Sequence, residues 1–535
     1  MAKLLFDREK HPDITFDDVF LLPNNPVREE VLQKCGSEER TRLLALEGEE
    51  DSRMARSFVL ELAEKYNIGG QFSRDDVDLT PRGGLANTPM VIANMNNVSG
   101  RRMAEAIARV GGIAAIPQDK TDKEIEGIVD YMRTRHPLYE TPVQIESDTK
   151  VHDFRRVLGK RSHDAAVVTN GGKELLGILA NSDLPQGINA DVSVEPFVRR
   201  EDLLTAPDGI EALEALELLE KHPGIRYLPI LDAKGGVVGV FTRTDAAMRL
   251  RYKPNIDAEN GGLRAMYTVG ALNKNPLDRV RFLMDNGVRD ILFDTANFDQ
   301  GTAPYRNVEK AAALAAQRCV RINLIAGNVV TREATRNILL AGASFVKVGV
   351  GPGAMCTTRM KTGVGRPQVS AILECVEEAS KHNGYVIADG GIQYPRDVAV
   401  ALASGADYVM AGSLFAGTYE SPGDLQHDER GAYKVNYGMA STRASVLRTI
   451  GRTKRTPNQI FRDAVGHRSE GISEGRVYLK PDMESVALLQ HDLLDGAASS
   501  AAYANALSFQ EFPKKAVMGI QTPSGFKEGT AKATF

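Results

Sequence analysis

Eight short apolar segments recur along this 535-residue chain, with polar or Gly residues repeatedly at their C-terminal ends. Helical patterns lie between most neighbours, for example at 307–319 and 396–406. Apolar strands that alternate with helices are typical of a parallel sheet covered on both faces. Eight such units favour a (β/α)8 barrel over a doubly wound open sheet, which is the alternative for this pattern. The segments are MVIAN (90–94), GIAAIP (112–117), MYTVGA (266–271), DILFDTA (290–296), NLIAGN (323–328), FVKVGV (345–350), YVIADGG (385–391) and YVMAGSLF (408–415).

A second domain is predicted between the second and third segments, because the roughly 150 residues there are too many for one crossover helix. The inserted stretch contains an internal repeat, with Gly177 aligned to Gly239 and Asp183 to Asp245. Each copy has the pattern strand, Gly-rich turn, strand and helix start. We therefore expect the barrel in residues 1–137 and 256–535, and a separate domain in residues 138–255.

Residues 26–66 form a further insertion within the N-terminal part of the barrel. This stretch is charged, and its apolar residues have helical spacing, which predicts two amphipathic helices. We find no chemistry-bearing motif in it, so a packing or oligomer-contact role is expected.

The bulk composition excludes several classes of function. The net charge of −4 gives no electrostatic reason to expect a nucleic acid or an anionic membrane as partner. No window approaches the apolar run of about 20 residues that a membrane span needs. The four cysteines lack CxxC spacing, so a structural zinc site is not expected, and so few cysteines fit a reducing compartment such as the cytoplasm.

A Gly-rich loop with one cysteine, GVGPGAMCTTRMKTGVGRPQ (349–368), follows the sixth apolar segment. In a barrel this loop lies at the catalytic end. Cys356, beside many backbone N–H groups, can act there as a thiolate nucleophile. The alternative is a small buried hydrophobic residue, as most cysteines are.

The loop closely resembles the catalytic loop shared by IMP dehydrogenases and GMP reductases. The resemblance extends to ANMNNV (93–98), ADGGI (388–392), MAGSLFAGT (410–418) and YGMAS (437–441). The insertion is similar to a tandem pair of CBS domains, which in other proteins often binds purine nucleotides. An ATP or GTP effector at this pair is implied, and so is a homotetramer or homo-octamer.

The resemblance implies roles for individual residues. Cys356 corresponds to the nucleophile that attacks C2 of the purine, and Thr358 to its hydroxyl partner. The segment SEGR (473–476) resembles a motif of GMP reductases, which makes Glu474 the partner of Thr358. Asp389 resembles the carboxylate that binds the ribose hydroxyls. The residues implied for the 5′-phosphate and the purine are Gly391, Gly412, Ser413, Tyr437, Gly438 and Met439.

The same resemblance implies a nicotinamide cofactor and a metal ion. Asp294 and Thr295 match the strand end that contacts the nicotinamide ribose. NADPH is expected, with NAD as the alternative. The carbonyls of Gly351, Gly353 and Cys356 are positions at which many IMP dehydrogenases hold a monovalent cation, K⁺.

Two reactions are open to such a site, and both use a covalent bond from Cys356 to C2. In IMP dehydrogenases hydride is transferred from C2 to NAD, and water then hydrolyses the adduct. The base that activates this water is an Arg on a mobile flap, and a Tyr comes directly after this Arg in the sequence. In GMP reductases ammonia leaves first, and NADPH then reduces C2. The flap region, 440–479, has no Arg-Tyr pair, although Arg462 or Arg468 could serve as the base. The sequence therefore favours a GMP reductase of the CBS-containing branch over an IMP dehydrogenase, with a catalytically silent nucleotide sensor as the third interpretation.

Overall fold

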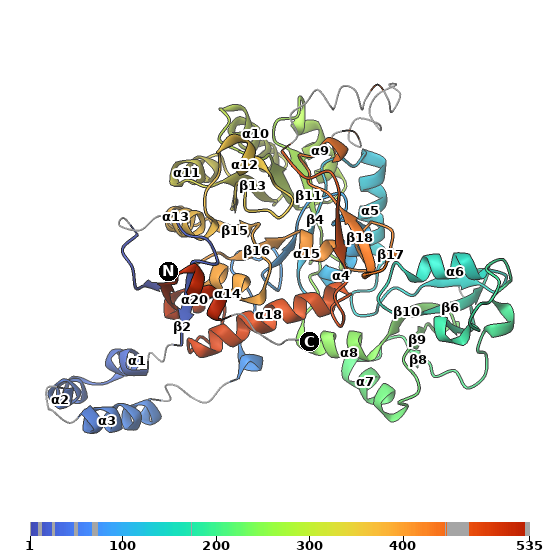
Figure 1. The fold of residues 1–535 in the computed structure, drawn as a ribbon, viewed down its shortest axis with the longest axis horizontal. Helices are drawn as coiled ribbons and strands as arrows, with labels where there is room; N and C mark the ends of the chain where they lie inside the picture. The colour runs from blue at the N-terminus through green and yellow to red at the C-terminus, as the bar shows by residue number, and fades with distance from the viewer. Residues whose placement is uncertain are drawn as a thin grey trace.

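Eight parallel strands close into a barrel at the centre of the computed structural model (Figure 1). The structure describes residues 2–8, 13–23, 27–47, 52–66, 73–172, 174–444, 446, 459 and 470–529. Each apolar segment singled out in the sequence supplies one barrel strand, so the predicted (β/α)8 barrel is confirmed. The strands are β3 (Met90–Ile92), β4 (Ile113–Ile116), β11 (Met266–Gly270), β12 (Asp290–Asp294), β13 (Asn323–Val329), β14 (Phe345–Val348), β15 (Tyr385–Asp389) and β16 (Tyr408–Ala411).

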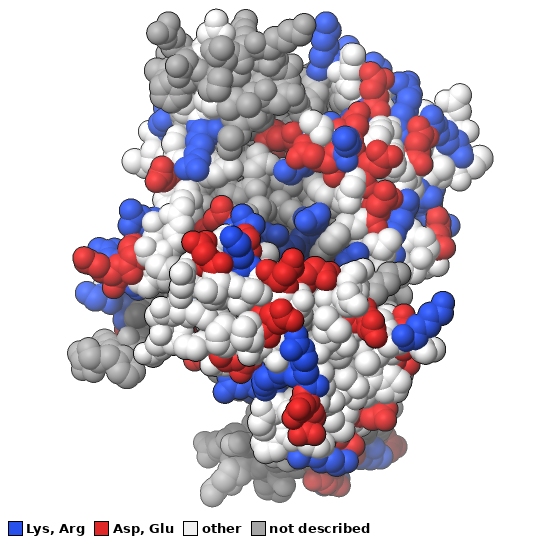
Figure 2. All heavy atoms as spheres, turned by 90° about the vertical axis from the view of Figure 1, so that its right-hand side faces the viewer, with Lys and Arg blue, Asp and Glu red and all other residues white. Residues whose placement is uncertain are grey.

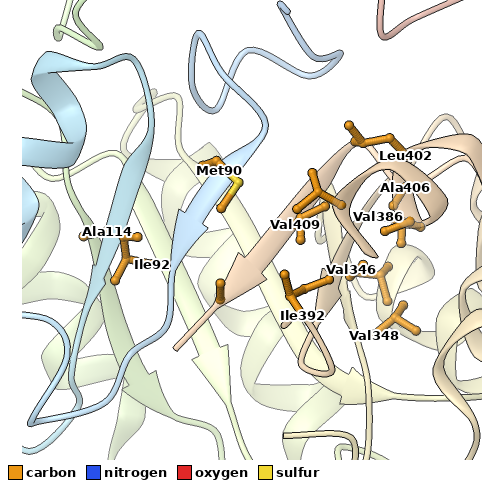
Figure 3. Close-up of a cluster of buried hydrophobic side chains, with 14 of the residues drawn as sticks. Met90, Ile92, Ala114, Val346, Val348, Val386, Ile392, Leu402, Ala406 and Val409 are labelled. Carbon is orange, nitrogen blue, oxygen red and sulfur yellow. The ribbon is translucent and has the colours of Figure 1, made fainter. Parts of the chain in front are cut away.

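Both faces of every barrel strand are buried, which explains the continuous apolar runs. On β16, Tyr408 and Met410 belong to the cluster that fills the barrel, whereas Val409 packs with the residues that face the helices. Figure 3 shows the helix-facing side, where Val386 and Val409 lie beside Leu402 of a covering helix. Burial on both sides leaves the strand ends as the places where polar side chains reach solvent.

Helices surround the barrel, and two of them match helical patterns expected at 307–319 and 396–406. One of them begins at Ala303, about four residues before its pattern, and the other at Pro395, one residue before its pattern. Pro304 and Pro395 lie in the first turns of these helices, where a backbone N–H has no intrahelical acceptor and its absence costs nothing. None of the helices in the described ranges is long and apolar enough to cross a membrane. The covering helices are α4 (Arg101–Arg109), α5 (Asp122–Thr134), α9 (Pro276–Asp285), α10 (Ala303–Gln317), α11 (Arg332–Leu340), α13 (Gln368–Lys381), α14 (Pro395–Ala403) and α18 (Val486–Tyr503).

Two smaller sheets and several short helices accompany the barrel. A three-stranded sheet of β1 (Lys3–Leu4), β20 (Val517–Ile520) and β2 (Val19–Leu22) brings the chain ends together. An antiparallel sheet of β17 (Gln426–Asp428), β18 (Gly431–Asn436) and β19 (Gly475–Tyr478) extends from the loop after β16. The remaining short helices are η1 (Arg74–Asp76), α12 (Thr358–Thr362), α15 (Ser413–Ala416), α19 (Phe512–Lys515) and α20 (Pro523–Glu528).

The stretch between α5 and β11 folds into two similar halves. The first half contains a sheet of β5 (Gln144–Glu146), β6 (Ala165–Asn170) and β7 (Glu174–Ala180), with α6 (Val151–Leu158) and the turns η2 (Asn181–Asp183) and η3 (Glu195–Phe197). The second contains β8 (Ala206–Pro207), β9 (Leu228–Leu231) and β10 (Val237–Phe241), with α7 (Ala212–Lys221) and α8 (Arg243–Arg251).

The two repeat glycines have the same structural task in the two halves. A Cβ on Gly177 would lie 2.4 Å from the carbonyl oxygen of Arg199, and one on Gly239 would lie 2.3 Å from Cβ of Tyr139. In each half a crossing segment pairs with the strand that carries the glycine. The internal repeat in the sequence thus reflects a repeated close approach of a crossing segment, through the carbonyl of Arg199 in one half and the side chain of Tyr139 in the other.

The N-terminal insertion forms three helices, not the expected two: α1 (Val27–Lys34), α2 (Ser37–Glu47) and α3 (Ser52–Lys65). The pattern is broken at Gly36, whose N–H donates to Glu39 at the start of α2 (3.0 Å). The three helices project from the barrel (Figure 1) and have their own small apolar cluster, which includes Val31, Leu43 and Leu62.

Basic and acidic side chains alternate over the face of the molecule shown in Figure 2. Among the described residues on this face, neither sign forms a broad continuous surface.

Buried ion pairs join the insertion to the barrel. Arg161, which follows α6, donates to Glu105 of α4 (2.9 Å) and to Glu140 (2.7 Å). Arg109 pairs with the same two carboxylates, at 2.7 and 3.0 Å. Burial opposes the charge of Glu105, but Arg161 and Arg109 outweigh burial and hold the pKa of that carboxyl below its ordinary value.

We expect Arg161→Met to destabilise the protein, because it leaves two buried carboxylates with one arginine. Breaking a buried ion pair from one side costs about 3–5 kcal/mol. The matched control is Arg156→Met, whose guanidinium is 74% exposed, and which should change the free energy of unfolding by less than about 1 kcal/mol. Urea unfolding of both variants measures the difference. Equal unfolding midpoints would contradict the stabilising role of the buried pairs.

Candidate active site

A cavity of about 420 Å³ lies at the C-terminal ends of the barrel strands. Parallel strands bring their carboxyl ends to one rim, so residues far apart in sequence meet there. The cavity is covered by the loop after β14 and by residues 438–440 and 470–471.

The loop after β14 is held in a defined path. Gly349 has φ +144°, and a Cβ there would lie 2.1 Å from the carbonyl oxygen of Asp389, so only glycine fits. Farther along, Thr357 N–H donates to the carbonyl of Glu470 (2.8 Å), and Ile472 N–H donates to the carbonyl of Met355 (3.0 Å). These bonds pin the segment at 470–472 against the loop, with Cys356 exposed at the cavity.

Three side chains form a hydrogen-bonded series at the cavity wall. The thiol of Cys356 donates to Oγ1 of Thr358 (3.2 Å), and Thr358 Oγ1 donates to Oε2 of Glu470 (2.9 Å). Thr358 is 9% exposed, so its hydroxyl lies between thiol and carboxylate with little water access. We refer to these residues as the Cys356–Thr358–Glu470 triad. It offers a route for a proton between the thiol and the carboxylate.

The structure corrects the expected partner of Thr358, which is Glu470 and not Glu474. The side chain of Glu474 is 70% exposed and lies 3.5 Å from Arg443. The sequence Ser-Glu-Gly occurs twice, at 469–471 and 473–475, and the resemblance to the GMP reductase motif points to the second copy. An antiparallel bridge between Cys356 and Gly471 brings the first copy to the cysteine.

Lys347 is a site residue that the sequence interpretation missed. Its side chain is 3% exposed, and its ammonium lies 2.9 Å from Asp294 and 2.8 Å from Asp389. Burial opposes the charged ammonium, but the two carboxylates outweigh burial and raise the pKa of Lys347. Asn328 also contacts both Lys347 and Asp389. The signal was present in FVKVGV, where one lysine interrupts an apolar strand.

We expect Lys347→Met to lower kcat/KM by about 100-fold, because the two carboxylates that it joins would repel each other and shift. The control is Lys381→Met on α13, whose side chain is 50% exposed and which should stay within about threefold of the wild type. Steady-state kinetics of both variants give the comparison. A Lys347 variant with ordinary kcat/KM would rule out this positioning role.

Most of the residues expected at the site line the same cavity. Tyr437 does not: it is 8% exposed beside the cavity, with the guanidinium of Arg443 5.0 Å from its ring centroid. Ser413 is positioned by Asn436, whose amide donates to its hydroxyl (3.1 Å). The expected residues on the cavity wall are Asp294, Thr295, Gly351, Gly353, Cys356, Thr358, Asp389, Gly391, Gly412, Ser413, Gly438 and Met439.

The expected cation site at the carbonyls of Gly351, Gly353 and Cys356 stays a prediction. The carbonyl of Gly353 accepts one hydrogen bond, from the N–H of Cys356 (2.9 Å), and a second lone pair on this oxygen is left for a cation.

Comparisons with known proteins match this chain to one family. The family model described as "IMP dehydrogenase / GMP reductase domain" matches residues 73–532. GMP reductases of Mycobacterium tuberculosis and Mycobacterium bovis are 42% identical over 464 residues, which is 85% of this chain and 92% of theirs. The inosine-5′-monophosphate dehydrogenase of Aquifex aeolicus is 37% identical over 447 residues, 83% of this chain and 88% of its own.

Solved structures show the same fold. A variant of Trypanosoma brucei GMP reductase in complex with guanosine 5′-monophosphate aligns with a TM-score of 0.60 and 24% identity. The alignment covers 99% of this chain and all of the other.

Proposed function

The chain belongs to the IMP dehydrogenase/GMP reductase family, and on that premise we propose that it is a GMP reductase that converts GMP to IMP and ammonia with NADPH. The family consists of oxidoreductases that use nicotinamide cofactors. The observation that carries the proposal is the Cys356–Thr358–Glu470 triad, because it supplies both a nucleophile and a proton source for a leaving amine.

The first step is addition of the Cys356 sulfur to C2 of GMP. The thiol proton passes through the Thr358 hydroxyl to the Glu470 carboxylate, along hydrogen bonds of 3.2 and 2.9 Å. This leaves a thiolate to form the S–C2 bond and places the proton on Glu470. Thr358 lies between the two groups and only passes the proton on.

The second step is loss of the 2-amino group. Glu470, now protonated, returns its proton through Thr358 to the departing nitrogen, so ammonia leaves and a purine stays bound to sulfur at C2. When bound, NADPH supplies hydride to C2. Cys356 then leaves as thiolate, its S–C2 bond breaks, IMP is released, and the thiolate takes up one proton from solvent, which restores the thiol. One proton, one hydride and one ammonia balance the exchange.

The remaining cavity residues are assigned to binding. Asp389, oriented by Lys347 and Asn328, would accept hydrogen bonds from the ribose hydroxyls. Gly391, Gly412 and Ser413 would hold the 5′-phosphate with backbone and hydroxyl donors. Gly438 and Met439 would lie against the purine.

The cofactor side of the cavity suits a nicotinamide riboside. Asp294 and Thr295 lie on its wall, and Leu272, 52% exposed at the rim, offers an apolar surface for a ring. Asp294, Lys347 and Asp389 lie in a row, so the two carboxylates that would bind substrate and cofactor are oriented by one ammonium. The preference for NADPH over NAD is part of the proposal.

The alternative is IMP dehydrogenase, which needs a base that activates water. The flap region lacks the Arg-Tyr pair of those enzymes. Arg462 and Arg468, the other candidates for the base, lie outside the described residues. Identity to the mycobacterial GMP reductases is 42%, against 37% to the Aquifex dehydrogenase, and this difference also favours the reductase. The third interpretation, a catalytically silent nucleotide sensor, is disfavoured because the Cys356–Thr358–Glu470 triad is complete.

The inserted domain is proposed to be a CBS pair that binds a purine nucleotide such as ATP or GTP. A cavity of about 730 Å³ lies between its halves and includes Asp183 and Asp245 from equivalent repeat positions. Arg226 and Arg243 on its wall provide positive charge for phosphates. A homotetramer or homo-octamer in the cytoplasm completes the proposal.

The test compares two substrate pairs on the purified full-length protein. We expect kcat/KM for GMP with NADPH to exceed that for IMP with NAD by at least about 100-fold, since only the first reaction needs no activated water. Absorbance of the reduced nicotinamide follows both. Faster formation of NADH and XMP from IMP would establish the dehydrogenase instead.

A further inference from the structure

A second cavity, of about 410 Å³, lies at the N-terminus of α4 and shares no lining residue with the catalytic cavity. We call it the α4 cavity. It is bounded by residues 99–102, by one face of α5 and the loop before it, and by residues 420–422.

Hydrogen-bond donors in the wall of the α4 cavity lack acceptors. Ser99 is fully buried, and its hydroxyl has no hydrogen-bond partner. The Nε of Arg102 is also buried without a partner, and no described residue forms an ion pair with its guanidinium. The first N–H groups of α4 have no intrahelical acceptor, as in any helix, and Gly100 at the N-cap has no side chain to cap them. Buried donors of this kind are normally satisfied, so their convergence points to a missing acceptor.

The charges around this cavity are predominantly positive. Arg101, Arg102 and Lys120 contribute to its wall. Burial lowers the pKa of Arg102, and the neighbouring Arg161 and Arg101 lower it further. Burial lowers the pKa of Lys434, behind the same loop, to about 7; Glu420 opposes this shift, while Arg102 and Lys160 add to it. Lys120 pairs with Glu124 (3.2 Å) and Lys160 pairs with Asp424, so among the described side chains it is the guanidinium of Arg102 whose charge has no ion-pair partner here.

The two carboxylates at the cavity do not supply the missing acceptor. Glu124 accepts hydrogen bonds from the N–H of Thr121 (2.8 Å) and from Lys120 (3.2 Å). Glu420 accepts one from the N–H of Val486 (3.2 Å), and burial raises its pKa to about 7. A carboxyl that is partly neutral at pH 7 is a weak counter-ion.

We propose that the α4 cavity binds a phosphate group through Ser99, Arg102 and the first N–H groups of α4. A phosphate offers several strong acceptors and negative charge, which are what the buried donors and the helix N-terminus lack. The ligand is either inorganic phosphate or the phosphate of a small phosphorylated metabolite, for which the volume leaves room. The site is independent of the function proposed for the catalytic cavity.

The site can be located in crystals of the full-length protein grown with GMP, which fills the catalytic cavity, and soaked in selenate. We expect an anomalous peak within hydrogen-bonding distance of Ser99 Oγ and the Arg102 guanidinium. Arg102→Gln should remove the peak, and Arg281→Gln, an exposed arginine on α9, should keep it. No peak in the α4 cavity of the wild type overturns the proposal.

Solution titrations separate a true site from an adventitious ion only. With GMP saturating, inorganic phosphate and ribose 5-phosphate are titrated calorimetrically. Arg102→Gln should weaken the better ligand by at least about tenfold and Ser99→Ala by about threefold, as expected for lost charged and neutral hydrogen bonds. Tighter inorganic phosphate means a free-ion site, and tighter ribose 5-phosphate means a metabolite site. Should Arg102→Gln not fold, Ser99→Ala decides. Binding at soaking concentration only, or equal affinities in all variants, overturns the proposal.

Discussion

Cys356→Ala is expected to lower kcat for GMP and NADPH by at least about 10,000-fold while GMP still binds, because removing a covalent nucleophile leaves only binding and polarisation. The cavity wall keeps its shape, because alanine retains the hydrogen bond that the backbone N–H of residue 356 donates to the carbonyl of Gly353. Single-turnover kinetics measure the rate, and equilibrium titration measures GMP affinity.

The control for this variant is Cys319→Ala, because Cys319 is the other exposed cysteine among the described residues and lies just beyond α10. It should retain wild-type kcat within about threefold, as surface substitutions usually do. Turnover that persists in Cys356→Ala, or that is lost in Cys319→Ala, would refute the assigned nucleophile.

Glu470→Gln is expected to lower kcat by about 100- to 1,000-fold, the range typical of a lost general acid or base. Glutamine keeps the size of the side chain and can accept a hydrogen bond from the Thr358 hydroxyl, but it cannot take up a proton and return it. GMP affinity should change little, because the substitution removes proton transfer and leaves the binding residues in place.

Glu474→Gln is the matched control, since it is the same substitution four residues away on an exposed side chain. Its kcat should stay within about threefold of the wild type. A loss in Glu474→Gln with a normal Glu470→Gln would restore the assignment that sequence alone suggested, and the Thr358–Glu470 hydrogen bond would then be catalytically silent.

The barrel could be predicted from the sequence because its signal is local. The strands are buried on both faces, so most of their residues are apolar and each strand stands out in a short window, even where Lys347 interrupts one of them. The residues on the rim of the cavity could be predicted from the positions of the strands, because Asp294, Asp389 and Gly412 lie at or just after strand ends. The helices at 27–65 were less well predicted, because Gly36 falls inside a continuous pattern and divides it.

Glu470 and Lys347 escaped prediction because their roles depend on long-range pairing. The bridge from Cys356 to Gly471 joins segments more than a hundred residues apart. The local difference between the two Ser-Glu-Gly copies, Arg476 after the second and Ile472 after the first, favours the copy that does not reach Thr358. Lys347 is explained only when Asp294 and Asp389 are seen on either side of it. The sequence identified the kinds of residue at the site, whereas the fold determines which Ser-Glu-Gly copy contacts Thr358.

The most direct test of the account follows the 2-amino nitrogen of GMP. The wild-type protein is incubated with GMP labelled with ¹⁵N at that position and with NADPH, and ammonium, IMP and oxidised cofactor are quantified together. The account predicts one labelled ammonium and one IMP for each NADPH oxidised. Unlabelled or absent ammonium, with no IMP formed under conditions where IMP and NAD yield XMP, would contradict it.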